Sequence, residues 1–486
     1  MLRSRFFISC VGAIALAACS SDRAEVVAPV SLARVAPSVD ESASGRYVLQ
    51  SGNAGFGSDL AAAVAARGGS LDTEHDAAGL AVVSGLSATA AAGLSGVSGV
   101  IDVQPDFDVS INEPMAAAEA DASSVDATIS SVANPATAIR YSWQWNMRAI
   151  HADAAWAAGK LGDAGVTVAI LDTGIDYNNP DLNGLVDLSR SVSFVASDNA
   201  ITARYFPTRN VITDYHGHGT NVAAQASSKA VVHAGVTSKT TLIGVKVLGA
   251  SGGGSFSAVL NGVLWAADHG ADVANMSLGG AFSKAGNGRS LSLINRVFNY
   301  AAQKGMLIVV AAGNGTSDLD HNGNVYSTYC DAPHVVCVSS IGPKTATGVV
   351  DTPAYYTNFG RSAISVAGPG GNADAPSFSA SRWIWGTDIA SWVWSYCSKT
   401  RITGYTTTGL PITPCAAGNR VVGYIGTSQA SPHVAGLAAL LVAEHGHGRP
   451  QEIKHDIETS SDDLGQNGTD PYFGRGRINV KTALGL

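Results

Sequence analysis

From residue 141 onward, four nearly unbroken apolar runs alternate with stretches of helical periodicity. Such runs are typical of strands buried on both faces of a parallel sheet. Strands that alternate with helices predict a doubly wound α/β domain, with a mostly parallel sheet flanked by helices. The predicted strands cover residues 166–171, 241–248, 306–313 and 335–341, and the predicted helices cover 217–229, 256–270, 290–304 and 430–445.

The chain before residue 141 has a shorter-range pattern. Residues 46–112 predict a small α+β unit, because short apolar strands alternate with two short helices. Residues 113–140 are rich in Ala, Ser and Asp without apolar periodicity, which predicts a linker. Within the small unit, the predicted strands cover residues 46–50, 79–86 and the end of 97–111, and the helices cover 59–66 and 88–94.

Residues 1–18 have the form of an export signal, in which two arginines precede an apolar stretch over residues 6–18. That stretch is too short to remain in a bilayer as a spanning helix. It runs into Leu-Ala-Ala-Cys, which resembles the bacterial lipobox, and Cys19 is therefore the predicted lipidation site. The alternative is an ordinary signal peptide that is cut at a nearby small residue. Residues 19–45 predict a flexible tether.

Export changes the interpretation of the cysteines, because disulfides form outside the cytosol. Besides the cysteine within the signal and Cys19, four cysteines remain, and they allow three connectivities. Proximity in the sequence favours Cys330–Cys337 and Cys397–Cys415, and buried free thiols are the alternative. A net charge of −8 without any basic run argues against nucleic acid as a partner.

Three motifs place polar residues at strand ends or helix starts, where the ligand sites of doubly wound sheets lie. Asp172 follows the first strand of the large domain, His218 lies at the entry to its first helix, and Ser428 precedes its last helix. A serine at a helix start lies beside backbone N–H groups without partners in the helix, so one turn can supply nucleophile and oxyanion donor. The alternatives are a strand-end cap, a loop histidine and a serine N-cap.

The order Asp, His, Ser is that of one of the convergent catalytic triads. With LDTGID (171–176), HGHGTNVAA (216–224) and GTSQASPHVAG (426–436), the chain resembles the subtilisin family of serine peptidases. The resemblance covers roughly residues 141–486, and four further stretches follow the family in order. They are VKVLGASGGGSFS (245–257), NMSLGG (275–280), VVAAGNG (309–315) and YFGRGRINV (472–480).

The resemblance implies a secreted serine endopeptidase that acts on polypeptides. Ser428 would attack the peptide carbonyl, His218 would transfer the proton, and Asp172 would orient the imidazole. The side chain of Asn314 and the backbone N–H of Ser428 would form the oxyanion hole. The alternative for Asn314 is a turn residue in Gly-Asn-Gly. A serine esterase and an inactive, peptide-binding homologue are the competing functions. The peptide-strand segments argue against the esterase, and the four filled catalytic positions argue against the inactive homologue.

A peptide substrate of such an enzyme is expected to add a strand between two exposed backbone segments. The resemblance also puts a carboxylate, Asp331, near the base of the primary specificity pocket, where it favours Lys or Arg at the cleaved position. A surface turn is the alternative for Asp331. The two backbone segments are Gly252, Gly253 and Gly254 on one side, and Ser277, Leu278 and Gly279 on the other.

The N-terminal unit gains a role from the same resemblance. Residues 46–112 are similar to the ferredoxin-like prodomain of the family, an intramolecular inhibitor whose last segment lies in the active site and is cut there. A cut between about residues 111 and 141 separates the lipid from the catalytic domain, residues 141–486. We therefore expect a lipoprotein precursor in the bacterial cell envelope, which contacts the membrane only through its lipid and releases the catalytic domain.

Some stretches depart from the family pattern. Asn221 stands where the family usually has a second histidine. The loop 226–235 lacks the asparagines of the family's strong calcium site and includes Lys229, and the segment 318–324 lacks the closing Glu of a calcium loop. No cofactor is expected for catalysis, and no complete motif supports structural calcium. Residues 372–425 are an insertion that either walls the cleft or packs internally, with Trp383, Trp385, Trp392 and Trp394.

Overall fold

The computed structural model describes residues 45–52, 55–111, 118–121, 131–279, 282–343, 350–372 and 391–486, with the backbone alone for 118–121. The predicted signal, the tether up to residue 44, Cys19, Trp383 and Trp385 lie outside these residues. Among the described residues, no helix combines the length and the apolar character that a membrane span needs.

The large domain is built on a seven-stranded sheet in which every pair of neighbours is parallel. The strand order is β16-β15-β13-β11-β7-β9-β8, so β7 lies inside the sheet and its carboxyl end is flanked by those of β9 and β11. The strands are β7 (Thr167–Asp172), β8 (Val192–Ser193), β9 (Thr241–Lys246), β11 (Val273–Met276), β13 (Leu307–Ala311), β15 (Val335–Ile341) and β16 (Val366–Pro369).

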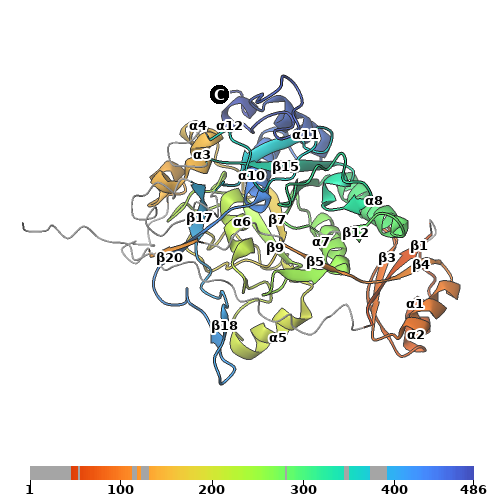
Figure 1. The fold of residues 1–486 in the computed structure, drawn as a ribbon. Coiled ribbons are helices and arrows are strands. Elements are labelled where there is room, and N and C mark those ends of the chain that lie inside the picture. The colour runs from red at the N-terminus through yellow and green to blue at the C-terminus, as the bar shows by residue number, and fades with distance from the viewer. Residues whose placement is uncertain are drawn as a thin grey trace, which may run out of the picture.

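Helices cover both faces of this sheet (Figure 1). Side chains of β7 alternate between two cores: Val168 and Ile170 pack with α6, α10 and α11, whereas Ala169 and Leu171 pack with α7 and α8. The prediction of a doubly wound α/β domain is confirmed. These helices are α6 (His218–Ala226), α7 (Phe256–Asp268), α8 (Gly288–Gln303), α10 (Thr427–His445) and α11 (Pro450–Thr459).

Several helices differ from the prediction. Helix α6 ends at Ala226, because the extended backbone from Ser227 pairs with Thr237. Helix α5 (Ala196–Tyr205) was not predicted, since the residues that it buries, Asp198 and Thr202, are polar and give no apolar period. The remaining short helices, also not predicted, are α3 (Trp145–Ala149), α4 (Ala152–Ala157) and α12 (Val480–Ala483).

The N-terminal unit is a four-stranded antiparallel sheet of order β2-β3-β1-β4. One face, which includes Leu49 and Val83, is covered by the two helices α1 and α2. Strand β2 was missed because its inward positions hold only one strongly apolar residue, Leu71. The elements are β1 (Tyr47–Ser51), α1 (Leu60–Ala65), β2 (Ser70–His75), β3 (Leu80–Ser84), α2 (Ala88–Ala92) and β4 (Val100–Pro105).

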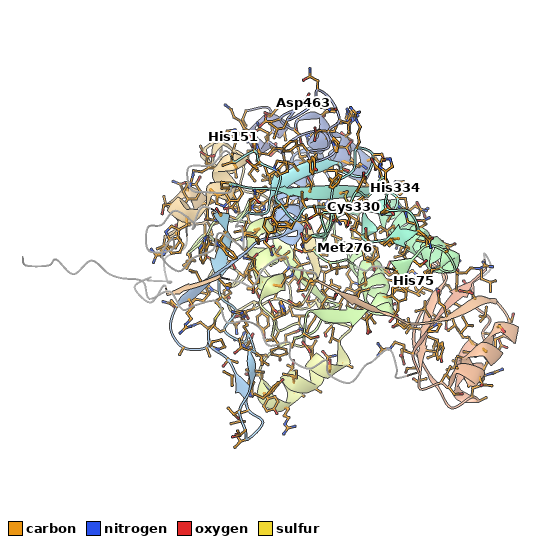
Figure 2. All side chains as sticks on the ribbon, viewed as in Figure 1. His75, His151, Met276, Cys330, His334 and Asp463 are labelled. Atoms are coloured by element: carbon orange, nitrogen blue, oxygen red, sulfur yellow. A yellow bond between two sulfur atoms is a disulfide. The ribbon has the colours of Figure 1, made fainter. Side chains whose placement is uncertain are left out.

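The opposite face of this small sheet packs on α7 and α8 of the large domain, as Figure 1 shows. Val48, Leu80 and Val82 belong to the same apolar core as those helices. At the edge of the contact, His75 Nε2 lies 2.9 Å from Asp268 Oδ2, and Figure 2 shows His75 at the junction of the two lobes. The unit therefore rests on the large domain through both apolar and polar contacts.

The predicted linker and the insertion meet in a second, smaller sheet. Strand β6 (Ala118–Asp121), within the predicted linker 113–140, pairs antiparallel with β20 (Arg420–Tyr424), which pairs with β17 (Val393–Tyr396). The linker thus contains a strand that its composition does not signal.

Within the insertion, the predicted disulfide Cys397–Cys415 is present. Trp392 and Trp394 are fully buried, which supports internal packing for these two tryptophans. The hairpin β18 (Gly404–Tyr405) and β19 (Pro411–Ile412) completes the insertion.

Candidate active site

Asp172 and His218 meet at the carboxyl edge of the sheet. Asp172 ends β7 and His218 begins α6, and His218 Nδ1 lies 2.7 Å from Asp172 Oδ1 with both side chains shielded from solvent. The backbone N–H of Thr173 donates to the same carboxylate oxygen at 2.7 Å. This geometry fixes the imidazole with Nδ1 toward the carboxylate, which leaves Nε2 as the nitrogen that can exchange a proton with a nucleophile.

A second buried carboxylate, Asp214, builds the turn that carries His218. Its Oδ2 accepts from the backbone and hydroxyl of Thr220, at 2.9 and 2.6 Å, and its Oδ1 accepts from Thr173 Oγ1 at 3.0 Å. Asp214 therefore ties the end of β7 to the start of α6. Space is short here, because a Cβ on Gly219 would overlap the carbonyl oxygen of Gly174. Sequence reasoning missed Asp214; its place just before the HGHG motif was the available signal.

His216 lies beside His218 without duplicating it. Its ring centroid is 6.2 Å from that of His218. Burial, with the neighbouring His218 as a further cause, lowers the pKa of His216 to about 3. His216 therefore stays neutral at the pH values at which a histidine base works, and it does not add a second charge beside His218.

Ser428 is not the N-cap of its helix. Gly426 is the N-cap of α10, so Ser428 is the second helical residue, and the predicted helix start at 430 was too late. The Ser428 hydroxyl donates to the Ser277 carbonyl at 3.3 Å, and the hydroxyl of Ser277 donates to the carbonyl of Ser428 at 2.7 Å. Position two of a helix presents its own N–H outside the helical ladder, which suits an oxyanion donor better than the capping position.

Asn314 lies against the same turn. Its Oδ1 accepts from both the N–H and the hydroxyl of Thr427 at 2.9 Å, and Thr427 Oγ1 accepts from Gly313 N–H at 3.0 Å. The first turn of α10 thus holds the amide oxygen of Asn314. Its Nδ2 lies toward Gly426, where an added Cβ would be 3.4 Å away. The four predicted catalytic residues thus come from strand ends and helix starts that share one edge of the sheet.

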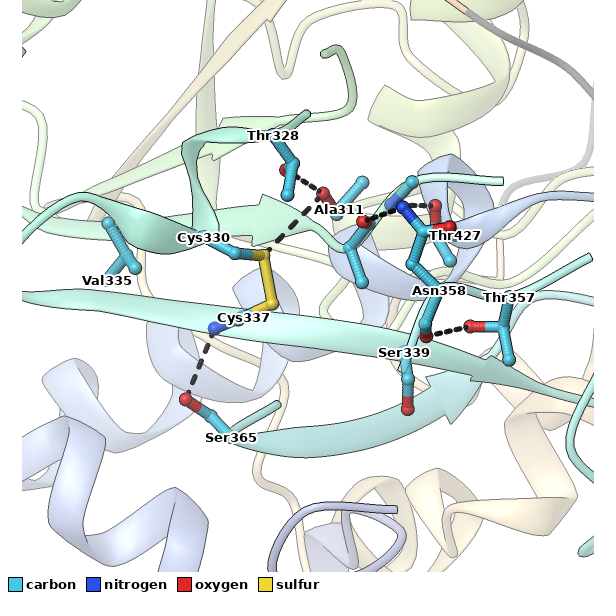
Figure 3. Close-up of a disulfide and its surroundings, with 12 residues drawn as sticks. Ala311, Thr328, Cys330, Val335, Cys337, Ser339, Thr357, Asn358, Ser365 and Thr427 are labelled. Atoms are coloured by element: carbon cyan, nitrogen blue, oxygen red, sulfur yellow. Dashed lines mark hydrogen bonds between the residues drawn. A yellow bond between two sulfur atoms is a disulfide. The ribbon is translucent and has the colours of Figure 1, made fainter. Parts of the chain in front are cut away.

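The predicted disulfide Cys330–Cys337 lies beside Ala311, the last residue of the strand that leads to Asn314. It joins the short helical turn η5 (Tyr329–Asp331) to β15, and Figure 3 shows it beneath the end of β13, the strand that leads to Asn314. Thr328 Oγ1 donates to the Ala311 carbonyl at 2.9 Å at the same place. The disulfide therefore ties η5 to β15 beside the end of β13, whose Ala311 carbonyl accepts the Thr328 hydroxyl.

The predicted substrate segments are occupied by the chain itself. Strand β5 (Asp108–Ser110), which follows the small sheet, pairs antiparallel with β10 (Gly253–Ser255), and Ser110 also bridges to Gly279. Ile111 N–H donates to the Gly252 carbonyl at 3.1 Å. The segment before the predicted linker thus lies as an added strand between the two predicted backbone segments.

Asp331, the predicted floor of the specificity pocket, is engaged in an ion pair. Its Oδ2 lies 3.1 Å from Lys284 Nζ, and both side chains are about one third exposed. Lys284 thus balances its charge. No described contact joins Asp331 to Asp172, His218, Ser428 or Asn314, and its described ion-pair partner is Lys284.

The loop that departs from the family's calcium pattern is held by a buried carboxylate, Asp181. Asp181 accepts from the backbone N–H groups of Val232 at 2.7 Å and His233 at 3.1 Å. Among the described residues, no group of three metal-binding side chains is present. Asp181 was not singled out in the sequence, since its partners are backbone groups.

A buried polar network supports α6 and α10 from behind. Asn146 Nδ2 donates to Gln225 Oε1 at 3.0 Å and lies 2.8 Å from His433 Nε2, while His433 Nδ1 lies 2.8 Å from the Gln429 carbonyl. Asn221, which replaces the family's second histidine, donates to Ser395 Oγ of the insertion at 2.9 Å. The network links the histidine helix, the serine helix and the insertion.

His433 makes stability depend on pH. Burial lowers the pKa of His433 to about 4, and its contacts need a neutral ring that donates from Nδ1 and accepts at Nε2. The contribution of neutral His433 to the free energy of unfolding is complete above pH ~6.5. It is lost as pH falls, because the histidine of the unfolded chain takes up a proton at a higher pH than the buried one. We expect the free energy of unfolding to fall by about 3 kcal/mol between pH ~6.5 and pH ~4 on this ground.

Denaturant titrations across that range, on a proteolytically silent Ser428→Ala background, measure this slope. His433→Gln should flatten it, whereas the exposed His455→Gln should not. Equal slopes for His433→Gln and the parent would contradict the assignment.

Comparison with known proteins agrees with this geometry. Residues 163–476 match the profile of the subtilase family, Peptidase S8. Thermitase of Thermoactinomyces vulgaris is 32% identical over 348 residues, which cover 70% of this chain and 95% of thermitase. Subtilisin E of Bacillus subtilis (strain 168) is 29% identical over 336 residues, or 69% of each protein.

Solved structures share the fold. The epidermin leader peptide processing serine protease of Staphylococcus aureus aligns with a TM-score of 0.68 at 20% identity, covering 91% of this chain and 98% of that one. A lanthipeptide protease aligns with a TM-score of 0.57 over 72% of this chain and 97% of that one, at 23% identity. The chain belongs to the subtilase family and is a subtilisin-like serine endopeptidase.

Proposed function

We propose that this endopeptidase works through Ser428, His218 and Asp172 and is made as a precursor that its own active site processes. The observation that carries the proposal is the buried 2.7 Å contact between His218 and Asp172, at the sheet edge where Ser428 and Asn314 also lie. A base oriented by a third group beside a serine is the arrangement that activates a hydroxyl.

The proposed reaction proceeds in two halves. Ser428 Oγ attacks the peptide carbonyl carbon while His218 Nε2 takes the hydroxyl proton, and Asp172 stabilises the imidazolium. Asn314 Nδ2 and the Ser428 N–H donate to the oxyanion of the tetrahedral intermediate. The imidazolium then protonates the leaving amine, and water, activated by the same imidazole, hydrolyses the acyl-enzyme.

The strand in the cleft favours a peptidase over an esterase. Ile111 N–H donates to Gly252, and β5 continues this pairing along β10. Such a ladder recognises successive peptide groups, and a simple ester offers none of them. The same strand supports the prodomain role of residues 46–112, since it blocks the cleft as long as it stays bound.

The register of this strand identifies the bond that the enzyme is expected to cut. Ser110 lies opposite Gly279 in an antiparallel bridge. A strand that continued in this register would bring position 112 opposite Ser277. The Ser277 carbonyl is the one that accepts the Ser428 hydroxyl. In that register the carbonyl of position 112 would lie next to Ser428, so the expected cut is between Asn112 and Glu113.

Mass spectrometry of the protein expressed from the full chain tests this cut. The fragment that contains Ser428 should begin at Glu113, and Ser428→Ala should yield no such fragment. A mature N-terminus on the far side of β6, near residue 141, would contradict the register.

The same spectra test export and lipidation, which we propose from the sequence. The lipid mass should lie on the fragment that contains Cys19. A lipidated, uncut chain in an active preparation would exclude release from the membrane.

Asp331 is proposed to favour basic residues at the cleaved position. Lys284 competes for its carboxylate, so Lys284→Ala should increase cleavage after Lys and Arg, and Asp331→Asn should lower it. A peptide library cut by both variants and the parent measures the preference. If both variants keep the parental cleavage preference, Asp331 has no role in selecting the residue at the cleaved position.

A further inference from the structure

An aromatic ring from the cleft-bound segment is held by aromatic rings of the large domain. Phe107 stacks on Phe256 with centroids 4.4 Å apart and planes 16° apart, and its centroid lies 5.2 Å from that of Phe282. Phe282 in turn stacks on Tyr326 at 4.7 Å. Aromatic pairs at these separations stabilise beyond the area that they bury. We call Phe256, Phe282 and Tyr326 the aromatic box.

The main chain fixes which residue enters the box. Phe107 carbonyl accepts from Phe256 N–H at 2.8 Å, and the ladder continues through β5 to Ile111. Phe107, Val109 and Ile111 alternate along an extended strand, so their side chains point to one face. All three belong to the apolar core of the large domain, Val109 as a buried member.

The walls of the box are held independently of the strand. Strand β12 (Phe282–Ser283) pairs with β14 (Val325–Tyr326), with Phe282 opposite Tyr326. Phe256 begins α7 and is fully buried. The ion pair between Lys284 and Asp331 joins the β12 side to the crosslinked turn η5. The box therefore belongs to the catalytic part of the chain and remains there after the proposed cut.

We propose that the aromatic box is a substrate subsite, which binds an aromatic side chain at the sixth position before the cut bond. This inference rests on the peptidase function and the cut proposed above: counting back from position 112 as the first residue, Phe107 is the sixth. A polypeptide in the same strand register presents its own sixth residue to the box. The enzyme thus selects extended segments with an aromatic residue, then apolar residues two and four positions later.

Internally quenched peptides based on the chain's own sequence test the subsite. The parent peptide spans residues 106–115, DFDVSINEPM. In one variant alanine replaces the phenylalanine, in another the phenylalanine moves one position towards the N-terminus, and a third begins at position 108. With the processed enzyme, all three should show kcat/KM about tenfold below the parent, since each leaves the box unfilled.

An enzyme variant assigns the effect to the box. In the Phe282→Ala enzyme, the ratio of kcat/KM between the parent and alanine peptides should fall from about ten to about one. The peptide that begins at position 108 should then be cut by this variant as efficiently as it is by the unmodified enzyme. Tyr405→Ala, an exposed aromatic on the distant hairpin, should keep the ratio. Equal kcat/KM for the parent and alanine peptides in the unmodified enzyme overturns the subsite and leaves the peptidase standing. No cleavage of any peptide overturns both.

Discussion

Ser428→Ala is expected to lower kcat by about six orders of magnitude and to leave the precursor uncut. That size is the one measured for the corresponding serine of subtilisin, a relative of this chain, and it is borrowed from there. The physical reason is that His218 and the oxyanion donors then have no oxygen nucleophile to activate. Residual hydrolysis comes from water acting in a site that still binds the substrate.

Hydrolysis of a fluorogenic peptide and the fragment pattern on a gel measure the two effects. Ser431→Ala is the matched control, because Ser431 lies one turn further along α10 and its hydroxyl also contacts Ser277, at 2.9 Å. That variant should cut itself and keep activity within about tenfold of the parent. A Ser428→Ala chain that processes itself at the parental rate would contradict the assignment of the nucleophile.

Asn314→Ala is expected to lower kcat by about 10²–10³ with little change in KM. This range was also measured on the equivalent asparagine of subtilisin. The amide donates to a charge that forms only in the transition state, so substrate binding does not depend on it. Because Asn314 Oδ1 also anchors Thr427, the alanine variant removes a donor and an anchor together.

Two further variants separate these roles. Asn314→Asp keeps an acceptor for Thr427 but places a negative charge beside the oxyanion, so kcat should fall at least as far as in the alanine variant. Thr427→Val removes the hydroxyl anchor and keeps the amide donor, and should cost about tenfold or less. A rise in KM at constant kcat in Asn314→Ala would assign the amide to ground-state binding instead.

The sequence predicted the large domain well because its strands are buried on both faces. Runs such as 166–171 leave little choice of structure, and the residues just after them form the site edge. Strand β2 was missed because two of its three half-buried positions are polar, Thr73 and His75. Helix α5 was missed because its buried residues, Asp198 and Thr202, give no apolar period. Strand β6 was missed because its order comes from pairing with β20, over three hundred residues away.

The proposed triad could be named from motifs, but the residues that support it could not. Asn146 acts through contacts with residues distant in sequence, and a lone Asn gives no pattern. Asp214 offered only its place just before the HGHG motif. The helix that carries Ser428 was predicted to start at residue 430, but it starts at Thr427, because helix ends are poorly defined by sequence. The aromatic box likewise needed the structure, because Phe107, Phe256 and Phe282 share no local motif.

The central claim is that Ser428 is a nucleophile activated by His218. Labelling of the processed enzyme with a fluorophosphonate, followed by peptide mapping, tests it most directly. We expect a single modified residue, Ser428, and a loss of labelling in His218→Ala processed in trans. Modification of another serine, or equal labelling of Ser428 without His218, would contradict the claim.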